Sequence, residues 1–359
     1  MKKHLLLLTF LSVIGNAQIV RKYSNEFLNI GAGARGLAMG GAVISNQNDV
    51  YAPMWNPAGL TEVESDWQGA AMHAEYFESI AKYDYISFAK ALDSKNGVLG
   101  ISIVRLGIDN ILNTTQMIDS EGNIDYDKIT KFSTSDYAGI ISYAFHPGGK
   151  QKLSVGVNAK IVYRNIGKFA NGFGFGFDLG AIYKTDSGYQ LGAMLRDATT
   201  TVNFWTINQK ELSAVVNGEE FNPAPKDKME ITMPKLNMGI SKNFELNRDL
   251  ELLPEAGLNV DFAKTAALIS TDFASITPYL GAELSFQKMI FVRAGVNKFQ
   301  NVTDIEDLKR KVTFQPSAGI GVRYRGLTLD YAITSTGIGG SNYFSNFFSL
   351  KLDMGDFRN

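Results

Sequence analysis

The chain has 359 residues, of which 45% are hydrophobic and 20% charged, and its 35 basic and 36 acidic residues leave a formal net charge of -1. Because no long basic run accompanies this balance, nucleic acid is excluded as an expected partner. The absence of cysteine excludes disulfides, thiolate metal sites and cysteine nucleophiles.

Residues 1–17 have the pattern of a secretory signal peptide. Lys2 and Lys3 precede an apolar run over residues 5–14, and Ala17 closes a small-residue cleavage site. The alternative, a membrane-spanning helix, is disfavoured because the run is too short to cross a bilayer. We therefore expect export and cleavage after Ala17.

Residues 18–66 do not alternate like a strand and are rich in small side chains. Residues 27–42 read FLNIGAGARGLAMGGA, and residues 55–60 read WNPAGL. Small residues allow close backbone packing, and proline and glycine favour tight bends. We therefore expect a compact plug, or hatch, inside the rest of the fold. The residues assigned to its motif are Gly31, Gly33, Arg35, Gly36, Gly40, Gly41, Asp49, Trp55, Asn56, Pro57 and Gly59.

The same segment contains a formal match to the dinucleotide fingerprint G-x-G-x-x-G at Gly31, Gly33 and Gly36. That fingerprint works by placing a helix N-terminus against a pyrophosphate within alternating strands and helices. No such alternation follows here. We expect neither a nucleotide site nor any other cofactor.

From Trp67 onward, stretches of about ten residues alternate apolar and polar side chains. In residues 151–164, for example, Leu153, Val157 and Ile161 share one face, whereas Asn158 and Lys160 lie on the other. One face suits lipid and the other a wet interior. About fourteen such strands are predicted, near residues 67–76, 83–91, 97–107, 134–146, 151–165, 172–185, 188–197, 232–244, 250–263, 276–287, 288–297, 312–324, 326–335 and 345–354.

The connections alternate between tight turns, such as 186–187 and 325–326, and wider loops, of which 108–133 and 198–231 are the widest. Short periplasmic turns and long outer loops are typical of an outer-membrane barrel, and a soluble β-sandwich, the alternative, has no reason to keep this asymmetry. We predict an all-β protein: an antiparallel transmembrane β-barrel over residues 67–359, surrounded by outer-membrane lipid.

Charged residues of both signs fall on the predicted inner face of the barrel. They either pair across the lumen and hold the hatch, or line a path for a substrate or an ion. They are Asp178, Arg196, Glu255, Asp261, Glu283, Arg293, Asp330, Lys351 and Asp353.

Taken together, the NIGAGARGLAMGGA block, Asp49 and the WNPAGL block resemble the N-terminal signature of the PorV/PorQ family, which is related to the FadL-type outer-membrane transporters. The resemblance implies a fourteen-stranded barrel with a luminal hatch and a place in the type IX secretion system. PorV-like proteins there collect cargo by its C-terminal signal domain at the translocon and carry it to the sortase complex. The implied partners are secreted cargo domains and translocon or sortase components.

A shuttle of this kind needs surface loops that hold cargo. Within the predicted loop 198–231, we expect an apolar set to contact the cargo, or else to fold over the barrel mouth. The set consists of Phe204, Trp205, Val215, Val216 and Phe221.

The rival function is FadL-like transport of hydrophobic small molecules past the hatch and sideways through a gap in the wall. It would be favoured by an apolar lumen and by a kinked strand beside the hatch. The glycine-rich run 172–180 marks either such a kink or a position where the hatch lies close. The predicted inner faces are instead mostly polar or glycine. An enzyme is least expected, because three histidines without ligand spacing and no G-x-S-x-G elbow offer no metal site or triad.

Overall fold

The computed structural model describes residues 24–92, 97–119, 121–216, 219–221, 225, 228–303, 309–338 and 341–355. The predicted signal peptide lies outside these residues. Among them, no helix is both long and apolar enough to cross a bilayer.

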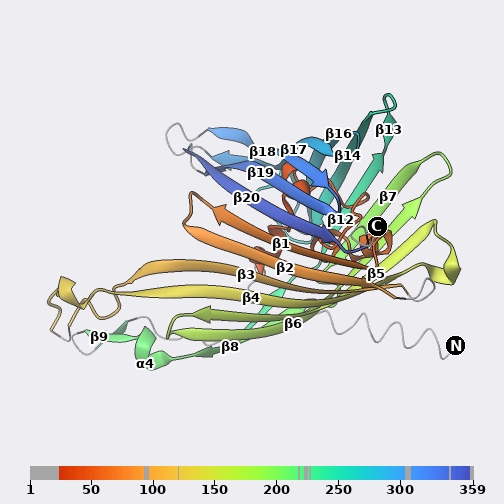
Figure 1. Cartoon of the computed structure of the whole chain (residues 1–359). Coiled ribbons are helices and arrows are strands. Elements are labelled where there is room, and N and C mark those ends of the chain that lie inside the picture. The colour runs from red at the N-terminus through yellow and green to blue at the C-terminus, as the bar shows by residue number, and fades with distance from the viewer. Residues whose placement is uncertain are drawn as a thin grey trace, which may run out of the picture.

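The strands form a closed antiparallel barrel, in which β1 pairs with both β2 and the last strand, β20 (Figure 1). Fourteen strands make the wall, namely β1 to β7, β12, β14 and β16 to β20. Their bounds are β1 Trp67–Tyr76, β2 Ala81–Ala91, β3 Val98–Asn113, β4 Thr130–Phe145, β5 Leu153–Ile166, β6 Ala170–Lys184, β7 Tyr189–Arg196, β12 Lys235–Lys242, β14 Leu250–Asp261, β16 Ser275–Phe286, β17 Ile290–Thr303, β18 Arg310–Tyr324, β19 Leu327–Ile338 and β20 Ser341–Asp353. The predicted fold class is confirmed.

Shorter strands extend this wall or lie outside it. β8 (Thr201–Ile207) and β11 (Met229–Thr232) continue β7 and β12 outward, β13 (Phe244–Glu245) and β15 (Ile269–Ser270) lie at the rims, and β9 (Ala214–Val216) pairs with β10 (Glu219–Phe221) in a separate hairpin. Three short helical turns lie in the connections: η4 (Tyr126–Lys128), η5 (Pro147–Gly149) and α4 (Gln209–Leu212).

The two faces of the wall have the polarity that the alternation predicted. Ile161 on β5 and Phe175 on β6 are half exposed on the outside, while Asn158 and Lys160 are buried inside. An apolar outer band with a polar interior is the arrangement that a bilayer requires of a barrel. The charged residues predicted on the inner face do point inward, and most of them are buried in ion pairs.

The predicted loops 108–133 and 198–231 were too long. β3 continues to Asn113 and β4 starts at Thr130, while β8 and β11 take residues 201–207 and 229–232. In Figure 1, β3, β4, β6 and β8 reach well beyond most of the other strands. Above the membrane both faces of a strand meet water, so the hydrophobic alternation fades although the backbone pairing continues. The pattern therefore underestimates such strands at their outer ends.

The seventh strand of the wall is interrupted between β7 and β8. Six residues, 196–201, lie opposite three residues of β6, 176–178. Asp197 and Thr200 adopt φ values of 53° and 62°, in the left-handed region. This segment, residues 197–200, is called the strand-7 bulge below. The bulge adds three residues, an odd number, to this strand. Odd-numbered side chains therefore point outward before the bulge and inward after it.

Residues 24–66 lie inside the barrel, as Figure 1 shows for the chain segment that precedes β1. This hatch contains four short helical turns: η2 (Glu26–Asn29), α2 (Ala34–Ala38), α3 (Ala52–Trp55) and η3 (Pro57–Glu62). Pro53 and Pro57 each stand in the first turn of a helix, where a missing N–H costs no hydrogen bond.

Candidate functional site

The two sequence blocks of the hatch pack directly against each other. A Cβ at Gly31 would lie 2.3 Å from the indole of Trp55, and one at Gly36 would lie 2.8 Å from it. The Trp55 Nε1 donates a hydrogen bond to the carbonyl of Ala32 at 2.6 Å. The glycines of the first block therefore make room for the tryptophan of the second, and Gly33 does the same for the ring of Tyr51.

The side chain of Asn56 forms hydrogen bonds within the second block, to the loop before it and to the wall. It accepts a hydrogen bond from the N–H of Ala58 at 3.2 Å, which caps η3. Its Nδ2 donates to the carbonyl of Ile44 at 2.8 Å, and to the wall at the carbonyl of Ala181 at 3.1 Å. At Gly59 a Cβ would lie 2.4 Å from the carbonyl oxygen of Gln47, so only glycine fits there.

Arg35 joins the first block to the wall through a buried charge cluster. Its Nε donates to Glu283 at 2.9 Å and its Nη2 to Asn46 at 2.8 Å. Arg293 donates to the same Glu283 carboxylate and to Asp330. Burial disfavours the charged guanidinium, but the Glu283 carboxylate outweighs this, and the pKa of Arg35 is raised above its usual value.

Glu255 on β14 anchors the loop between the two blocks. Its carboxylate is 1% exposed and accepts hydrogen bonds from the backbone N–H groups of Ile44 and Ser45, at 2.7 and 3.0 Å. The hydroxyl of Ser45 and the amide of Asn46 also donate to it. One carboxylate thus holds four hatch donors.

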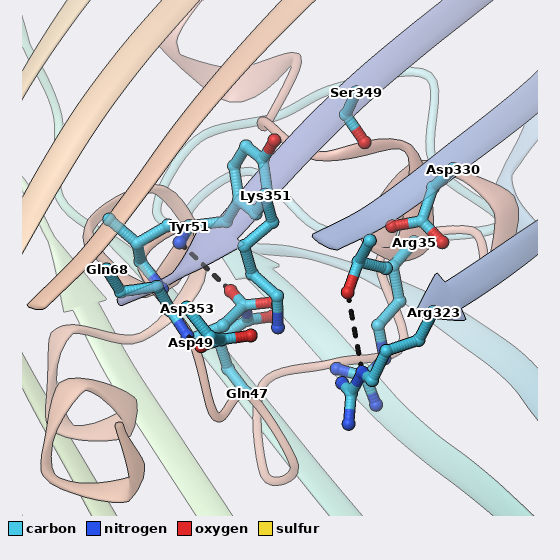
Figure 2. Close-up of polar contacts among 12 residues, drawn as sticks. Arg35, Gln47, Asp49, Tyr51, Gln68, Arg323, Asp330, Ser349, Lys351 and Asp353 are labelled. Atoms are coloured by element: carbon cyan, nitrogen blue, oxygen red, sulfur yellow. Dashed lines mark hydrogen bonds and ion pairs between the residues drawn. The ribbon is translucent and has the colours of Figure 1, made fainter. Parts of the chain in front are cut away.

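Asp49 fixes the hatch to the last strand, β20. It accepts hydrogen bonds from the N–H of Tyr51 at 2.9 Å and from the side chain of Gln47, and its carboxylate lies 3.6 Å from the Nζ of Lys351. Figure 2 shows this group with Gln68 at the left of the view, and Arg35 with Asp330 at the right.

Glycines on the inner face of the wall form a seat for the hatch backbone. A Cβ at Gly295 would lie 2.1 Å from the carbonyl carbon of Met39, and one at Gly192 would lie 2.3 Å from the carbonyl oxygen of Ile44. Any side chain would therefore push the hatch away. Gly156 and Gly281 meet the hatch backbone in the same way, whereas a Cβ at Gly180 or Gly319 would meet the side chain of Asn56 or Ala38.

The strand-7 bulge and the residue before it contact both the neighbouring strands and the hatch. Lys160 is buried between the carboxylates of Asp178 and Asp197, at 2.6 and 2.5 Å. Next to the bulge, Arg196 donates to the hatch carbonyls of Leu28 at 2.8 Å and Met54 at 2.6 Å. The kink predicted as one meaning of the run 172–180 thus lies in the following strand instead. The inner-face glycines 174 and 176 make room for its side chains Asn203 and Thr201, and Gly180 makes room for Asn56.

A cavity of about 320 Å³ lies on the hatch, towards the outer ends of the strands. Trp55, Ile30 and Leu37 of the hatch contribute to its lining, and the wall contributes residues such as Asn237 and Thr334. This cavity is called the vestibule below. Its lining is a mixture of polar and apolar side chains rather than a hydrocarbon surface.

The predicted cargo-contact residues do not form one loop surface. Phe204 and Trp205 lie in β8, where Phe204 points outward and is 51% exposed, while Trp205 points inward beneath the guanidinium of Arg164 at 5.3 Å. The separate β9–β10 hairpin contains Val215, Val216 and Phe221. The prediction of a single loop is wrong here because the bulge restarts strand pairing at Thr201.

Lys160 and the glycine seat were not singled out in the sequence. Lys160 is the one charged residue on the inner face of β5 between Ser154 and Val162. The alternation of this strand was therefore enough to indicate a buried charge in need of a partner. Its two carboxylate partners are 18 and 37 positions away, so the cluster required the register of β5, β6 and β7.

Neither a family model nor a curated protein matches this chain. Solved structures that do match include the toluene transporter TbuX of Ralstonia pickettii, with 14% identity, a TM-score of 0.56 and coverage of 90% of this chain and 98% of that one. The toluene transporter TodX of Pseudomonas putida has 14% identity and a TM-score of 0.57, and the match covers 89% of this chain and 96% of that one. The monoaromatic hydrocarbon channel CymD has 13% identity and a TM-score of 0.58, and the match covers 90% of this chain and 97% of that one. At these identities the likeness shows the fold alone: a closed antiparallel barrel of fourteen strands.

Proposed function

We propose that this FadL-type barrel moves a small molecule across the outer membrane, from the vestibule past the hatch. Among the solved structures with this fold are two toluene transporters and a monoaromatic hydrocarbon channel. The vestibule supplies an outward-facing cavity of a size suited to a small ligand. The hatch supplies a closure that keeps the lumen from being an open pore.

The observation that carries this proposal is the strand-7 bulge beside the hatch. A wall strand interrupted next to a plug is the place where a barrel can open with the fewest broken backbone hydrogen bonds. The bulge is closed by the ion pairs of Lys160 and by the two bonds from Arg196 to hatch carbonyls. Movement of the hatch turns at Leu28 and Met54 would release Arg196, and so couple the hatch to the wall.

The test is passage across a membrane that contains only this protein. The full chain is reconstituted into liposomes, and entry of radiolabelled solutes is compared with that into empty liposomes. The proposal expects saturable entry of a defined small solute. Entry that rises with concentration without saturation and is the same for every small solute would indicate a leak, and no entry above that of empty liposomes would overturn the proposal.

A second candidate function is PorV-like docking of secreted cargo. It is favoured by the two hatch blocks, which carry the resemblance to the PorV/PorQ family, and by the outer extensions of β3–β4 and β8–β11 with the β9–β10 hairpin (Figure 1). Such extensions are surfaces on which an exported domain could rest. Deletion of the protein separates the two candidates: periplasmic accumulation of cargo with a C-terminal secretion signal supports docking, whereas normal secretion with lost solute uptake supports transport.

A further inference from the structure

We propose that the vestibule binds a neutral, polyhydroxylated molecule of about disaccharide size. This inference rests on the proposed transport function and names its substrate class. Its first ground is the cavity itself, which has a volume of about 320 Å³ and lies between the hatch and the outer half of the wall.

Neutral hydrogen-bonding side chains dominate the wall of the vestibule. Amides and hydroxyls can each donate to and accept from an alcohol, whereas a hydrocarbon satisfies neither. A monoaromatic ligand such as toluene would remove water from this wall without replacing the hydrogen bonds. The side chains concerned are Asn29, Asn237, Asn259, Thr265, Thr277, Asn297, Gln300, Gln315, Ser317 and Thr334.

The charged side chains of the lining are largely neutralised by other groups. Lys235 lies 3.1 Å from Glu26 and 3.4 Å from Asp261, so three of the five charged lining residues form one cluster. Arg196 is turned to the hatch carbonyls. The fifth, Lys298, is exposed. The site therefore offers no concentrated charge to select an anion or a cation, which favours a neutral ligand.

Three buried oxygens on side chains that line this site have no hydrogen-bond partner among the residues that the structure describes. They are the Oγ1 of Thr334, a residue that is only 5% exposed, and the Oδ1 atoms of Asn237 and Asn297. Their amide partners are engaged: Asn237 Nδ2 donates to Asn259, and Asn297 Nδ2 donates to Gly40. Buried acceptors without donors are costly, and a ligand hydroxyl is a donor of the right kind.

The hatch and the first and last strands provide apolar surface at the same cavity. Trp55 and Leu37 of the hatch, Tyr76 of β1 and Phe347 of β20 line it. A sugar ring has hydroxyl groups around its edge and C–H groups on its faces. Such a ring can therefore place a face on an aromatic side chain while its hydroxyls reach the amides.

The direct test is a titration of the purified full chain with maltose in a detergent that has no sugar headgroup. Saturation-transfer NMR on the maltose protons and calorimetry report binding. We expect saturable binding, weakened roughly tenfold or more in the double variant Asn237→Leu, Thr334→Val. The matched control is Thr328→Val, which lies on the same face of β19 near the other end and outside the vestibule. It should bind within about twofold of the wild type.

Toluene is titrated in parallel and serves to separate the outcomes. Saturable binding of toluene with none of maltose would overturn this inference and leave the transport proposal standing. Maltose binding without solute entry into liposomes would support the inference and overturn transport. Equal weakening by the double variant and by Thr328→Val would also overturn it, because the effect would then be a general loss of fold.

Discussion

The two levels of the lumen are built on opposite principles. Around the hatch, the wall presents glycines against the hatch backbone, and buried charges that each have a partner. In the vestibule, the lining contains amides and hydroxyls, and three of their oxygens have no hydrogen-bond partner in the described part of the chain. At the first level the charges are paired, and the one buried nitrogen of the Arg35 cluster without a hydrogen bond to the described residues is Nη1 of Arg35 itself. The second level leaves hydrogen-bonding capacity unused, which is the basis of the proposed ligand site.

Filling the glycine seat should have the largest effect on this comparison. In Gly295→Leu the new Cβ would meet the Met39 backbone at 2.1 Å, which cannot be relieved by a side-chain rotation. We expect the hatch to be displaced, with protease cleavage within residues 24–66 and a loss of several degrees or more in the melting temperature. Gly139→Leu is the control, since Gly139 faces outward and a Cβ there meets nothing within 4 Å. Equal protease resistance in both variants would show that the hatch is not seated on this wall.

Removing the Glu255 carboxylate should be the next largest change. Glu255→Leu leaves the N–H groups of Ile44 and Ser45 buried without an acceptor, whereas the Ser45 hydroxyl keeps Ser241 and the Asn46 amide keeps the Ala42 carbonyl. Each orphaned donor costs about 1–3 kcal/mol. We expect hydrogen exchange of the Ile44 and Ser45 amides to accelerate by at least roughly a hundredfold, which corresponds to about 2.7 kcal/mol. Glu251→Gln, four residues away on the same face of β14, should leave these amides protected. Unchanged exchange of these two amides in Glu255→Leu would show that Glu255 does not hold the hatch.

Opening the strand-7 bulge should have an intermediate effect. Lys160→Met leaves the buried carboxylates of Asp178 and Asp197 without their cation, at a cost of about 3–5 kcal/mol. We expect solute entry into liposomes to rise while the barrel remains folded by circular dichroism. Lys152→Met provides the comparison, because Lys152 is half exposed and its ion pair is with the exposed Asp186. If both variants conduct like the wild type, the bulge is not where the wall opens.

The smallest effect is expected at the outer rim, far from both luminal levels. In the β3–β4 connection, hydrogen bonds from the Asn123 side chain and N–H and from the Glu121 N–H lower the pKa of Asp119. A carboxyl whose pKa falls on folding stabilises the fold above its unfolded pKa and loses that contribution as pH drops through the folded pKa. We expect this turn to loosen only in acid, as seen in amide NMR shifts, with the melting temperature unchanged. Loosening at neutral pH would contradict the assignment.

The alternation of single strands predicted the fold class, the number of strands and the inner face of most charges. Alternation of apolar and polar side chains depends only on which face of a strand meets lipid. It can therefore be recognised within one strand, as in β5. The two hatch blocks were also readable, since glycine, proline and tryptophan at close spacing already indicate an irregular packed segment. The ends of the outer strands were not, because lipid no longer imposes a pattern there.

The sequence alone thus determined that the chain closes into a barrel with a hatch, because lipid enforces a local pattern that each strand must satisfy by itself. Only the tertiary structure decided where the hatch sits, which glycines receive it and how Lys160 meets two aspartates. These features depend on the register between strands, and the three extra residues of the strand-7 bulge change that register without changing the composition of any strand.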